Sequence, residues 1–288
     1  MSDISCMSFN ILSYDTHKSG FEPPADRFPY IVATIDKYAP DLIGVQEACE
    51  AGSSEAAVFD WYGEMIRAME ERCYAWSSLK SHGDKFDREK QNIGCGLIIF
   101  YRKDRFTLND SGLFQFEHDK VRYFHWVKLT DEKFGKPVLF TNTHFSINQK
   151  VVDERVGIAG TAFRTVEAVK LINFWAKNCP PDTALFATGD YNSLPSADPQ
   201  VVLRSKQFKP SNLVAKAWDD CGSMYASRQF YTLDYCYVNP EATDIDEYRV
   251  IRDLFPSDSD CPLAGYPSDH RAIMTYATYR TDVPAVEI

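Results

Sequence analysis

Carboxylate, imidazole and carboxamide side chains occur in this sequence at the ends of apolar runs. The segment "FATGDYNSLPSADP", residues 186–199, brings Asp190 and Asn192 directly after one such run, and "NTHF" ends another with His144. Asp, Asn and Gly also favour ordinary surface turns, so each segment alone is more simply a strand end. Their recurrence at several run ends is what favours chemistry, because rigid strands present functional groups in the loops that follow them.

The candidate groups share two properties, since each is polar and each lies at the end of a predicted strand. They are Asn10, Glu47, His144, Asp190, Asn192, Asp234, Asp269 and His270. If the strand ends converge, the site holds carboxylates, histidines and carboxamides but no thiolate, a donor set that suits Mg²⁺ or Mn²⁺ better than Zn²⁺. Clustered carboxylates also repel one another, which favours a bound divalent cation.

Some of these residues indicate more specific roles. Glu47 ends a short apolar strand with no basic residue nearby, so it is the best single metal ligand, and Asp269 could add a second contact. Any carboxylate that came to lie beside His270 would fix one tautomer of the imidazole and raise its basicity. In-line attack on a phosphoryl centre needs these functions: a positioned nucleophile and neutralisation of the oxygen charges.

The elements that must position these residues alternate between strand and helix. Strands are predicted at 4–12, 41–47, 93–102, 121–129, 136–145, 183–190, 233–238, 248–255 and 268–279, and helices at 28–38, 54–72, 152–177 and 197–205. No linker or repeat interrupts them, which predicts a single domain over residues 1–288. The order predicts an α/β (α+β) sandwich in which mixed sheets carry helices on their outer faces.

Composition excludes some classes of protein. The net charge of −10 argues against a protein that holds nucleic acid through a broad basic face, although contact with a few phosphates around a metal stays possible. The eight cysteines form no Cys-x-x-Cys pair, so neither a structural zinc site nor a redox motif is indicated. No signal-peptide pattern or membrane-length apolar run is present, and we expect a cytoplasmic protein without a transmembrane segment.

The order of the motifs resembles the endonuclease/exonuclease/phosphatase superfamily, which has the DNase I-like fold. The matching segments are "SFNIL", "QE", "NTHF", "GDYN", "LDYCYV" and "SDH". They extend from Asn10 to His270, nearly the whole chain. The resemblance implies a four-layered sandwich of two facing mixed β-sheets flanked by helices, with the active site at the edge where the strands end.

The resemblance also implies roles for the metal-binding residues. By motif position, Glu47 would be the principal ligand, Asn10 would orient it, and Asp269 would lie beside it. Several family members carry a further acidic residue just before the strand at 93–102, where this chain has Asn92. That difference weakens the expectation of a second metal on this side.

The remaining motif residues would act on the phosphate and the water. His144 would contact the scissile phosphate and Asn192 would bind a phosphoryl oxygen. Asp190 would orient or deprotonate the attacking water, and Asp234 would orient His270. The sequence leaves open whether Asp190 or His270 activates the water.

These observations predict a hydrolase for phosphoric esters that depends on Mg²⁺ or Mn²⁺ and cleaves a phosphodiester or phosphomonoester. An RNA or DNA nuclease of the deadenylase-like branch is an alternative, and a non-catalytic binding module on the same fold is an alternative of another class. A serine hydrolase is disfavoured because no Gly-x-Ser-x-Gly motif is present. We expect a monomer whose partner is its phosphate-ester substrate.

Two further predictions concern side-chain environment. Tyr191 lies between Asp190 and Asn192, so strand alternation should turn it to the opposite face, where it would pack. Arg164 falls among apolar residues of the predicted helix at 152–177. An inward-facing arginine needs a carboxylate, so Arg164 is expected to form a structural ion pair.

Overall fold

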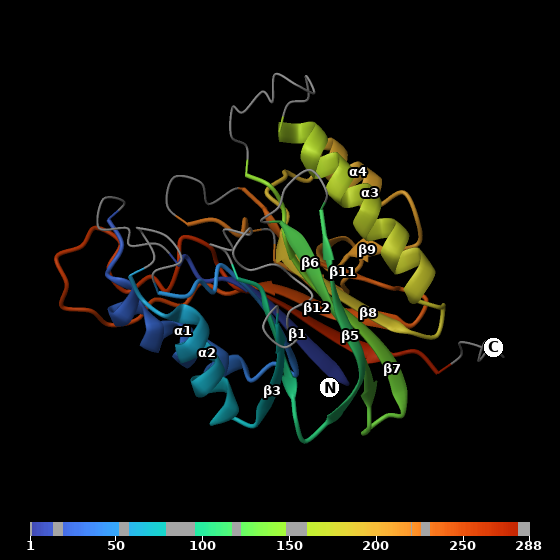
Figure 1. Ribbon diagram of the computed structural model, residues 1–288, viewed down its shortest axis with the longest axis horizontal. Coiled ribbons are helices and arrows are strands. Elements are labelled where there is room, and N and C mark those ends of the chain that lie inside the picture. The colour runs from blue at the N-terminus through green and yellow to red at the C-terminus, as the bar shows by residue number, and fades with distance from the viewer. Residues whose placement is uncertain are drawn as a thin grey trace.

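The computed structural model describes residues 2–13, 20–51, 58–78, 96–116, 122–147, 160–219, 221–225 and 231–281. Two β-sheets face each other within these residues (Figure 1). The first has the order β10 (Ala217–Trp218), β12 (Thr243–Val250), β13 (Ile273–Tyr279), β1 (Ile4–Asn10), β2 (Leu42–Gln46), β4 (Ile98–Arg102) and β3 (Tyr74–Ser78). The second has the order β5 (Phe106–Gln115), β6 (Tyr123–Asp131), β7 (Lys136–His144), β8 (Ala184–Asp190), β11 (Asp234–Val238) and β9 (Lys209–Pro210).

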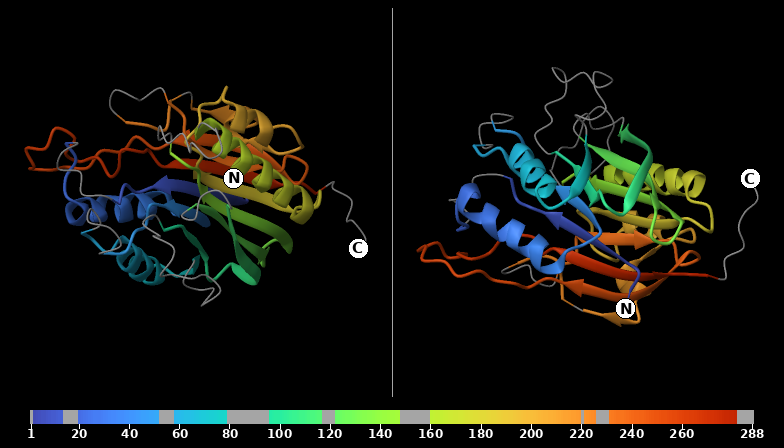
Figure 2. Two further views of the ribbon diagram at one scale, coloured as in Figure 1. Left: turned by 45° about the horizontal axis from the view of Figure 1, so that its top comes forward. Right: turned by 90° about the horizontal axis from the view of Figure 1, so that it is seen from below.

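Helices cover the outer face of each sheet. The helices α1 (Pro24–Tyr38) and α2 (Trp61–Glu70) pack on the first sheet, and α3 (Gly160–Asn178) and α4 (Asp198–Leu203) pack on the second, as Figures 1 and 2 show from three directions. A short 3-10 helix, η3 (Ser211–Leu213), follows β9. The layers are therefore helix, sheet, sheet and helix, which confirms the predicted four-layered α/β sandwich. Both sheets are mixed, because β1 and β2 run parallel, as do β7 and β8, while their other main neighbours are antiparallel.

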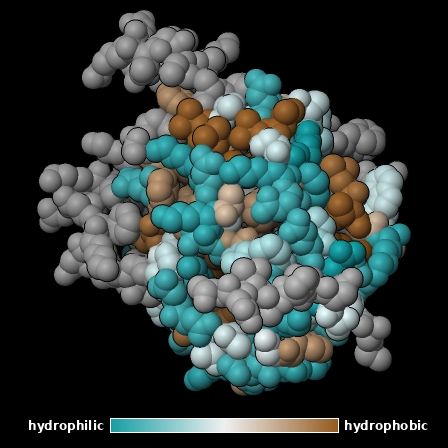
Figure 3. Space-filling model, turned by 90° about the vertical axis from the view of Figure 1, so that its right-hand side faces the viewer, coloured by the Kyte–Doolittle hydropathy of each residue, from teal (hydrophilic) through white to brown (hydrophobic). Residues whose placement is uncertain are grey.

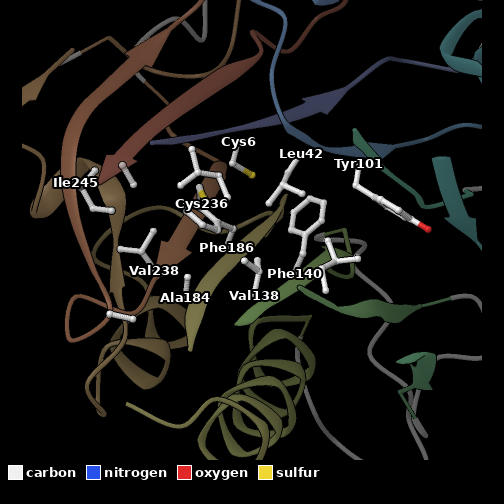
Figure 4. Packing of buried hydrophobic residues seen from close by; sticks show 14 of the residues in the cluster. Cys6, Leu42, Tyr101, Val138, Phe140, Ala184, Phe186, Cys236, Val238 and Ile245 are labelled. Carbon is white, nitrogen blue, oxygen red and sulfur yellow. The ribbon is translucent and has the colours of Figure 1, made fainter. Parts of the chain in front are cut away.

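Strand alternation divides the apolar side chains between three cores. Residues at every second position of each central strand point between the sheets, where Cys6, Leu42, Phe140 and Phe186 meet (Figure 4). The positions between them point outward and pack under the helix pairs on either side. Each sheet is thus buried on both faces, which explains why its central strands read as nearly continuous apolar runs.

The inward positions change from apolar to polar towards one end of the sandwich. They run Ile4, Cys6, Ser8 and Asn10 along β1, Val138, Phe140, Asn142 and His144 along β7, and Ala184, Phe186, Thr188 and Asp190 along β8. The strands are in register at that end, where His144 pairs with Asp190 across the second sheet. The alternation that directs apolar side chains into the inner core therefore also directs the last inward residue of each of these strands into the predicted site.

A buried hydrogen-bond network joins the two sheets just below this end. The Asn142 Nδ2 donates to the backbone carbonyls of Val45 (2.8 Å) and Ile98 (3.2 Å) in the opposite sheet. The Asn142 Oδ1 accepts from Gln46 Nε2 (2.7 Å) and Thr188 Oγ1 (3.3 Å). The sheets approach closely here because β2 carries Gly44, and a Cβ at that position would collide with the side chains of Thr188 and Asn142.

Several predicted elements differ from the observed ones. The strands β3 and β5 were not predicted. Half of the residues of β5 are exposed, and the strand contains Asn109, Asp110 and Gly112, residues that disfavour strands and are tolerated on this sheet edge. The strand predicted at 248–255 is β12, which ends at Val250 and begins earlier, with Thr243 and Ile245 pointing into the inner core region.

The observed helices also begin at other residues than the predicted ones, and some of the predicted helical residues are not described by the structure. The structure starts α1 at Pro24, a residue that favours the first helical turn because it needs no backbone N–H there. The helix α2 starts at Trp61 after an Asp60 side chain that accepts from Gly63 N (3.1 Å). Residues 54–57 and 152–159 of the predicted helices, together with Asn92, lie outside the described residues.

The surface of the described residues carries both hydrophobic and hydrophilic side chains. Figure 3 shows one face on which hydrophobic patches lie separated among hydrophilic side chains. No described helix combines the length and the apolar composition that a membrane span requires.

The network around Asn142 makes a prediction about stability. Replacing Asn142 with Ala removes four buried hydrogen bonds, three of them to the opposite sheet, so we expect the free energy of unfolding to fall by about 3 kcal/mol. Urea unfolding followed by circular dichroism measures this. Asn109→Ala is the matched control, because Asn109 makes one exposed hydrogen bond on β5 and should change stability by roughly 0.5 kcal/mol or less. Equal losses in the two variants would contradict a special role for Asn142.

Candidate active site

Three neighbouring strands of the second sheet place the central residues of the site side by side. In the register of the sheet, His144 on β7 lies opposite Asp190 on β8, and Asp190 lies opposite Asp234 on β11. All three side chains are buried. Across the gap, Asn10 ends β1 of the first sheet, so one edge of the sandwich collects residues from both sheets.

Asn10 connects two carboxylates that come from different sheets. Its Nδ2 donates to Glu47 Oε1 and to Asp190 Oδ2, both at 3.1 Å. Its Oδ1 accepts from Leu12 N (3.1 Å), which fixes the orientation of the amide. Asn10 therefore holds the carboxylates as a hydrogen-bond donor, and its oxygen is already engaged.

Glu47 reaches the site through an unusual backbone conformation. Gln46 points between the sheets, so continued alternation would turn Glu47 outward, but Glu47 has a φ of 64°. This left-handed conformation, rare for residues other than glycine, returns its side chain to Asn10 and to Ser13, whose N–H donates to Oε2 (3.2 Å). Burial raises the pKa of Glu47, and the charges of Asp269 and Asp190 raise it further.

Asp190 is the most connected residue of the site. Its Oδ1 accepts from Asn192 N (2.9 Å), while its Oδ2 accepts from Asn10 and lies 3.4 Å from His144 Nε2 and 3.8 Å from His270 Nε2. Burial raises the pKa of Asp190 to about 6, and the charge of Asp234 adds to this shift while His270 opposes it. The carboxylate therefore titrates near neutral pH in the metal-free protein.

His270 and Asp234 form a buried pair. Asp234 Oδ2 lies 2.8 Å from His270 Nδ1. Burial alone would lower the pKa of His270, but the charges of Asp234, Asp190 and Asp269 raise it well above its ordinary value. His270 is therefore protonated at neutral pH in the metal-free protein, and its Nε2 faces Asp190.

His144 has the opposite electrostatic character. Burial lowers its pKa well below the ordinary value, and the charges of Arg122 and His270 lower it further. At neutral pH the imidazole is therefore neutral. Its Nε2 faces Asp190, and its Nδ1 is buried without a hydrogen-bond partner among the described residues.

In the segment from Asp190 to Asn192, the middle residue packs in the core and the two outer residues belong to the polar site. Tyr191 is fully buried in the outer core, where its hydroxyl donates to Ala187 O (3.1 Å), which confirms the packing role predicted for it. Asn192 has a φ of 46°, and its Nδ2 donates to Phe145 O (3.0 Å). One N–H of its amide is thus engaged by the loop after β7, and the amide has a second.

The eight predicted residues all belong to this edge of the sandwich, with Asp269 half-buried beside Glu47. Ser268 was not predicted, although its Oγ donates to Asn10 O (2.7 Å) and accepts from His270 N (3.1 Å), tying the last motif to the first strand.

Arg27 is a second residue that the sequence reasoning missed. Its fully buried guanidinium donates to the carbonyls of Leu12 and Pro267, both at 2.7 Å, and so joins the segment after β1 to the segment before Asp269. A signal for it existed. Arg27 lies at helical spacing with the buried Ile31 and Ile35 of α1, so its side chain had to face inward.

The residues present fit a divalent cation. Ligand atoms of Asp190, Asp234 and His270 lie within 4.8 Å of one another, and Asp234 Oδ1 is buried without a partner among the described residues. Burial is the main cause of the raised pKa values of Glu47 and Asp190, and the charges of neighbouring carboxylates add to it. A hard cation with oxygen ligands would stabilise their ionised forms.

Comparisons with known proteins agree with this architecture. The sequence matches the profile of the Endonuclease/Exonuclease/phosphatase family over residues 7–270, whereas no curated protein matches it significantly. Among solved structures, the chain is similar to a mannosyl-6-phosphatase of Bacteroides thetaiotaomicron VPI-5482 (TM-score 0.74, 18% identity, 96% of this chain and 100% of that one). It is also similar to the human Nocturnin catalytic domain with bound sulfate (0.68, 19%, 96% and 94%) and to D. rerio TDP2 with a single-strand DNA product (0.67, 17%, 96% and 98%).

The buried pair makes a prediction about pH. Asp234→Asn removes a charge that raises the pKa of His270, so His270 should lose its proton at a lower pH. In the wild type, the contribution of His270 to stability is complete below a pH of ~6.5 and is lost as the pH rises through the folded-state pKa. NMR titration of the imidazole in metal-free protein measures the shift. The exposed Asp244→Asn, which breaks the ion pair with Arg280, is the control and should leave this pKa unchanged. An unchanged pKa in Asp234→Asn would contradict the assignment.

Proposed function

The chain belongs to the endonuclease/exonuclease/phosphatase family, and on this premise we propose that it is a phosphoesterase that uses Mg²⁺ or Mn²⁺. Members of this family are hydrolases that act on phosphoester bonds. The observation that carries the proposal is the convergence of Asn10, Glu47, Asp190 and His270, supplied by both sheets, on one edge of the sandwich. Their mutual hydrogen bonds fix polar groups around a common point, as positioned catalysis requires.

In the proposed reaction, Asp190 is the base. The water oxygen forms a bond to phosphorus, its proton passes to Asp190, and the bond from phosphorus to the leaving oxygen breaks. A pKa of about 6 suits this task, because the carboxylate is ionised at neutral pH and still basic enough to accept a proton. His270 is the weaker candidate for this role, since it is already protonated at neutral pH.

The histidines and Asn192 act on the phosphate. Protonated His270, held by Asp234, is a cation that can donate from Nε2 to a phosphoryl or leaving oxygen. Neutral His144 and the second amide N–H of Asn192 provide further polar contacts without additional charge. Asn10 keeps Asp190 in place throughout.

Glu47 would hold the cation, with Asp269 adding a contact from the last motif. When bound, the cation supplies positive charge that neutralises the phosphoryl and leaving oxygens and lowers the repulsion among the carboxylates. Ser13 N and Asn10 Nδ2 restrain the two oxygens of Glu47 in advance, which reduces the cost of organising the ligand.

The substrate is a phosphodiester or a phosphomonoester. A net charge of −10 disfavours a nuclease that grips a long duplex through a basic face. A nuclease of the deadenylase-like branch, acting on short or single-stranded substrates, is the alternative within the same reaction class. A non-catalytic module would bind phosphate esters without turning them over, so turnover decides between these readings.

The proposal predicts loss of activity in two variants. Asp190→Asn and His270→Gln should lower kcat by about 10³-fold or more, because each removes a group that acts on the reacting atoms. Release of p-nitrophenol from bis-p-nitrophenyl phosphate and its monoester, with Mg²⁺ or Mn²⁺, measures turnover, and short RNA, DNA and inositol phosphates extend the panel. The control Asp246→Asn breaks a surface pair with Lys216 and should keep full activity. Full hydrolysis in EDTA would overturn the metal dependence.

The electrostatics of Glu47 predict how the metal affects stability. Saturating Mg²⁺ should raise the Tm of the wild type by roughly 5 °C, because it binds only the folded state. Glu47→Gln should lose most of this shift. It should also be at least as stable as the wild type without metal, since burial and like charges raise the pKa of Glu47 and make its ionised form unfavourable at neutral pH.

Differential scanning fluorimetry over a Mg²⁺ series measures both effects. The exposed Glu132→Gln is the same chemical change on a surface strand end outside the site and should behave like the wild type. A normal Mg²⁺ shift in Glu47→Gln would remove Glu47 as the principal ligand.

A further inference from the structure

Two arginines next to the site are buried without a carboxylate partner. Arg122 precedes β6 with 7% of its surface exposed, and Arg164 lies in α3 with 5% exposed. Within the described part of the chain, neither guanidinium has a carboxylate oxygen within 4 Å. The ion pair predicted for Arg164 is therefore wrong, although the physical reason for expecting one still holds, because a buried guanidinium needs a counter-charge.

Their hydrogen bonds are few and long. Arg122 Nη1 donates to His144 O at 3.4 Å, and Arg164 Nη1 donates to Ser146 O at 3.3 Å. The Arg164 Nε is buried without a partner among the described residues. A guanidinium has five N–H donors, and the described residues accept one hydrogen bond from Arg122 and one from Arg164.

The buried Arg27 and the half-buried Arg105 show what a satisfied guanidinium looks like, whereas the buried Arg271 also has an Nε without a partner among the described residues. Arg105 bonds to Asp131 at 2.5 Å and to Asp41 at 2.8 Å, and Arg27 donates to several backbone carbonyls. Arg122 and Arg164 differ from Arg27 and Arg105. Both guanidinium groups lie against the loop after β7 and have fewer partners among the described residues than Arg27 or Arg105.

The nearest acidic side chain on the same helix is occupied elsewhere. Glu167 lies one turn after Arg164, but its Oε1 and Oε2 accept from Ser146 Oγ (2.5 Å) and Ser146 N (3.1 Å). The charge of Glu167 acts on Arg164 only from a distance beyond an ion pair.

Both arginines lie on the side of the site away from the proposed metal ligands. They hold the loop that follows β7, and their charges act on His144 and on Asp190. Glu47 and Asp269 belong to the opposite side, at the ends of β2 and before β13. The site therefore has a carboxylate-rich half for a cation and an arginine-rich half for an anion, with Asp190 and His144 between them.

We propose that Arg122 and Arg164 form a second anion subsite that binds a phosphate group of the substrate one linkage away from the scissile phosphate. This inference rests on the proposed function and narrows it to phosphoesters that carry a second phosphate. A phosphate fits the observations because its oxygens accept several N–H donors at once, and forked guanidinium groups match it in charge and geometry.

The first test compares substrates that differ only in this group. A dinucleoside monophosphate is offered without a terminal phosphate, with a 5′-phosphate and with a 3′-phosphate, and kcat and KM are measured for each. The wild type should prefer one phosphorylated form by at least 10-fold in kcat/KM, mainly through a lower KM. In R122Q/R164Q this preference should fall to about 1, and R122K/R164K should recover part of it because it retains the charge.

A control variant and a binding measurement without turnover distinguish a failure of the subsite from a failure of the proposed function. Arg102→Gln removes an arginine that pairs with Asp104 at the surface and should keep the preference. Calorimetry with pyrophosphate in EDTA should show binding to the wild type that weakens at least 10-fold in R122Q/R164Q.

Hydrolysis without any preference for a second phosphate would overturn the subsite and leave the proposed function standing. No hydrolysis of any substrate, combined with arginine-dependent pyrophosphate binding, would overturn the proposed function and support the subsite. Pyrophosphate binding that is equal in the wild type and R122Q/R164Q would also overturn the subsite. If R122Q/R164Q does not fold, the substrate preference of the wild type and of R122K/R164K decides in the same way.

Discussion

The hydrogen-bond network around Asn142 is the constraint on which the rest of the site depends, because it fixes how far apart the two sheets lie. Asn142 uses both amide hydrogens on backbone carbonyls of the first sheet and both oxygen lone pairs on Gln46 and Thr188. Gly44 removes the side chain that would hold the sheets apart at this level. Two residues further along the strands, the separation set here brings Asn10 of one sheet to Asp190 of the other.

Above this network, the structure brings together charges that repel one another. Glu47 and Asp190 both have raised pKa values, and their burial and shared surroundings are the cause. The protein offsets part of the repulsion with protonated His270 and with amide donors, yet Asp234 Oδ1 has no partner among the described residues. Such a site is costly without a cation, and that cost is the physical reason to expect metal binding to stabilise the fold.

The buried arginines extend the same reasoning to the other half of the site. Arg27 and Arg105 are satisfied by protein groups and therefore serve the fold, one by joining active-site segments and the other within an ionic network. Arg122 and Arg164 have few partners among the described residues, so their charge is available to a ligand. Buried charged groups without full compensation therefore point to ligands in two parts of the site. The carboxylates favour a cation, and the arginines favour an anion.

The sequence by itself determined the fold class and the identity of the strand-end residues, because period-2 alternation and motif order are local properties of the chain. It could predict that Asn10, His144 and Asp190 lie at the last positions of strands, that Asp234 lies near the start of one, and that Tyr191 packs. It could not determine that Glu47 points into the site, since only the left-handed backbone at that residue reverses the alternation. Nor could it determine the partners of Asn142, Arg27 or Arg164, which are separated from them by tens or hundreds of residues. Those contacts depend on sheet spacing and on which loops meet at one edge, and these are set only when the two sheets pack.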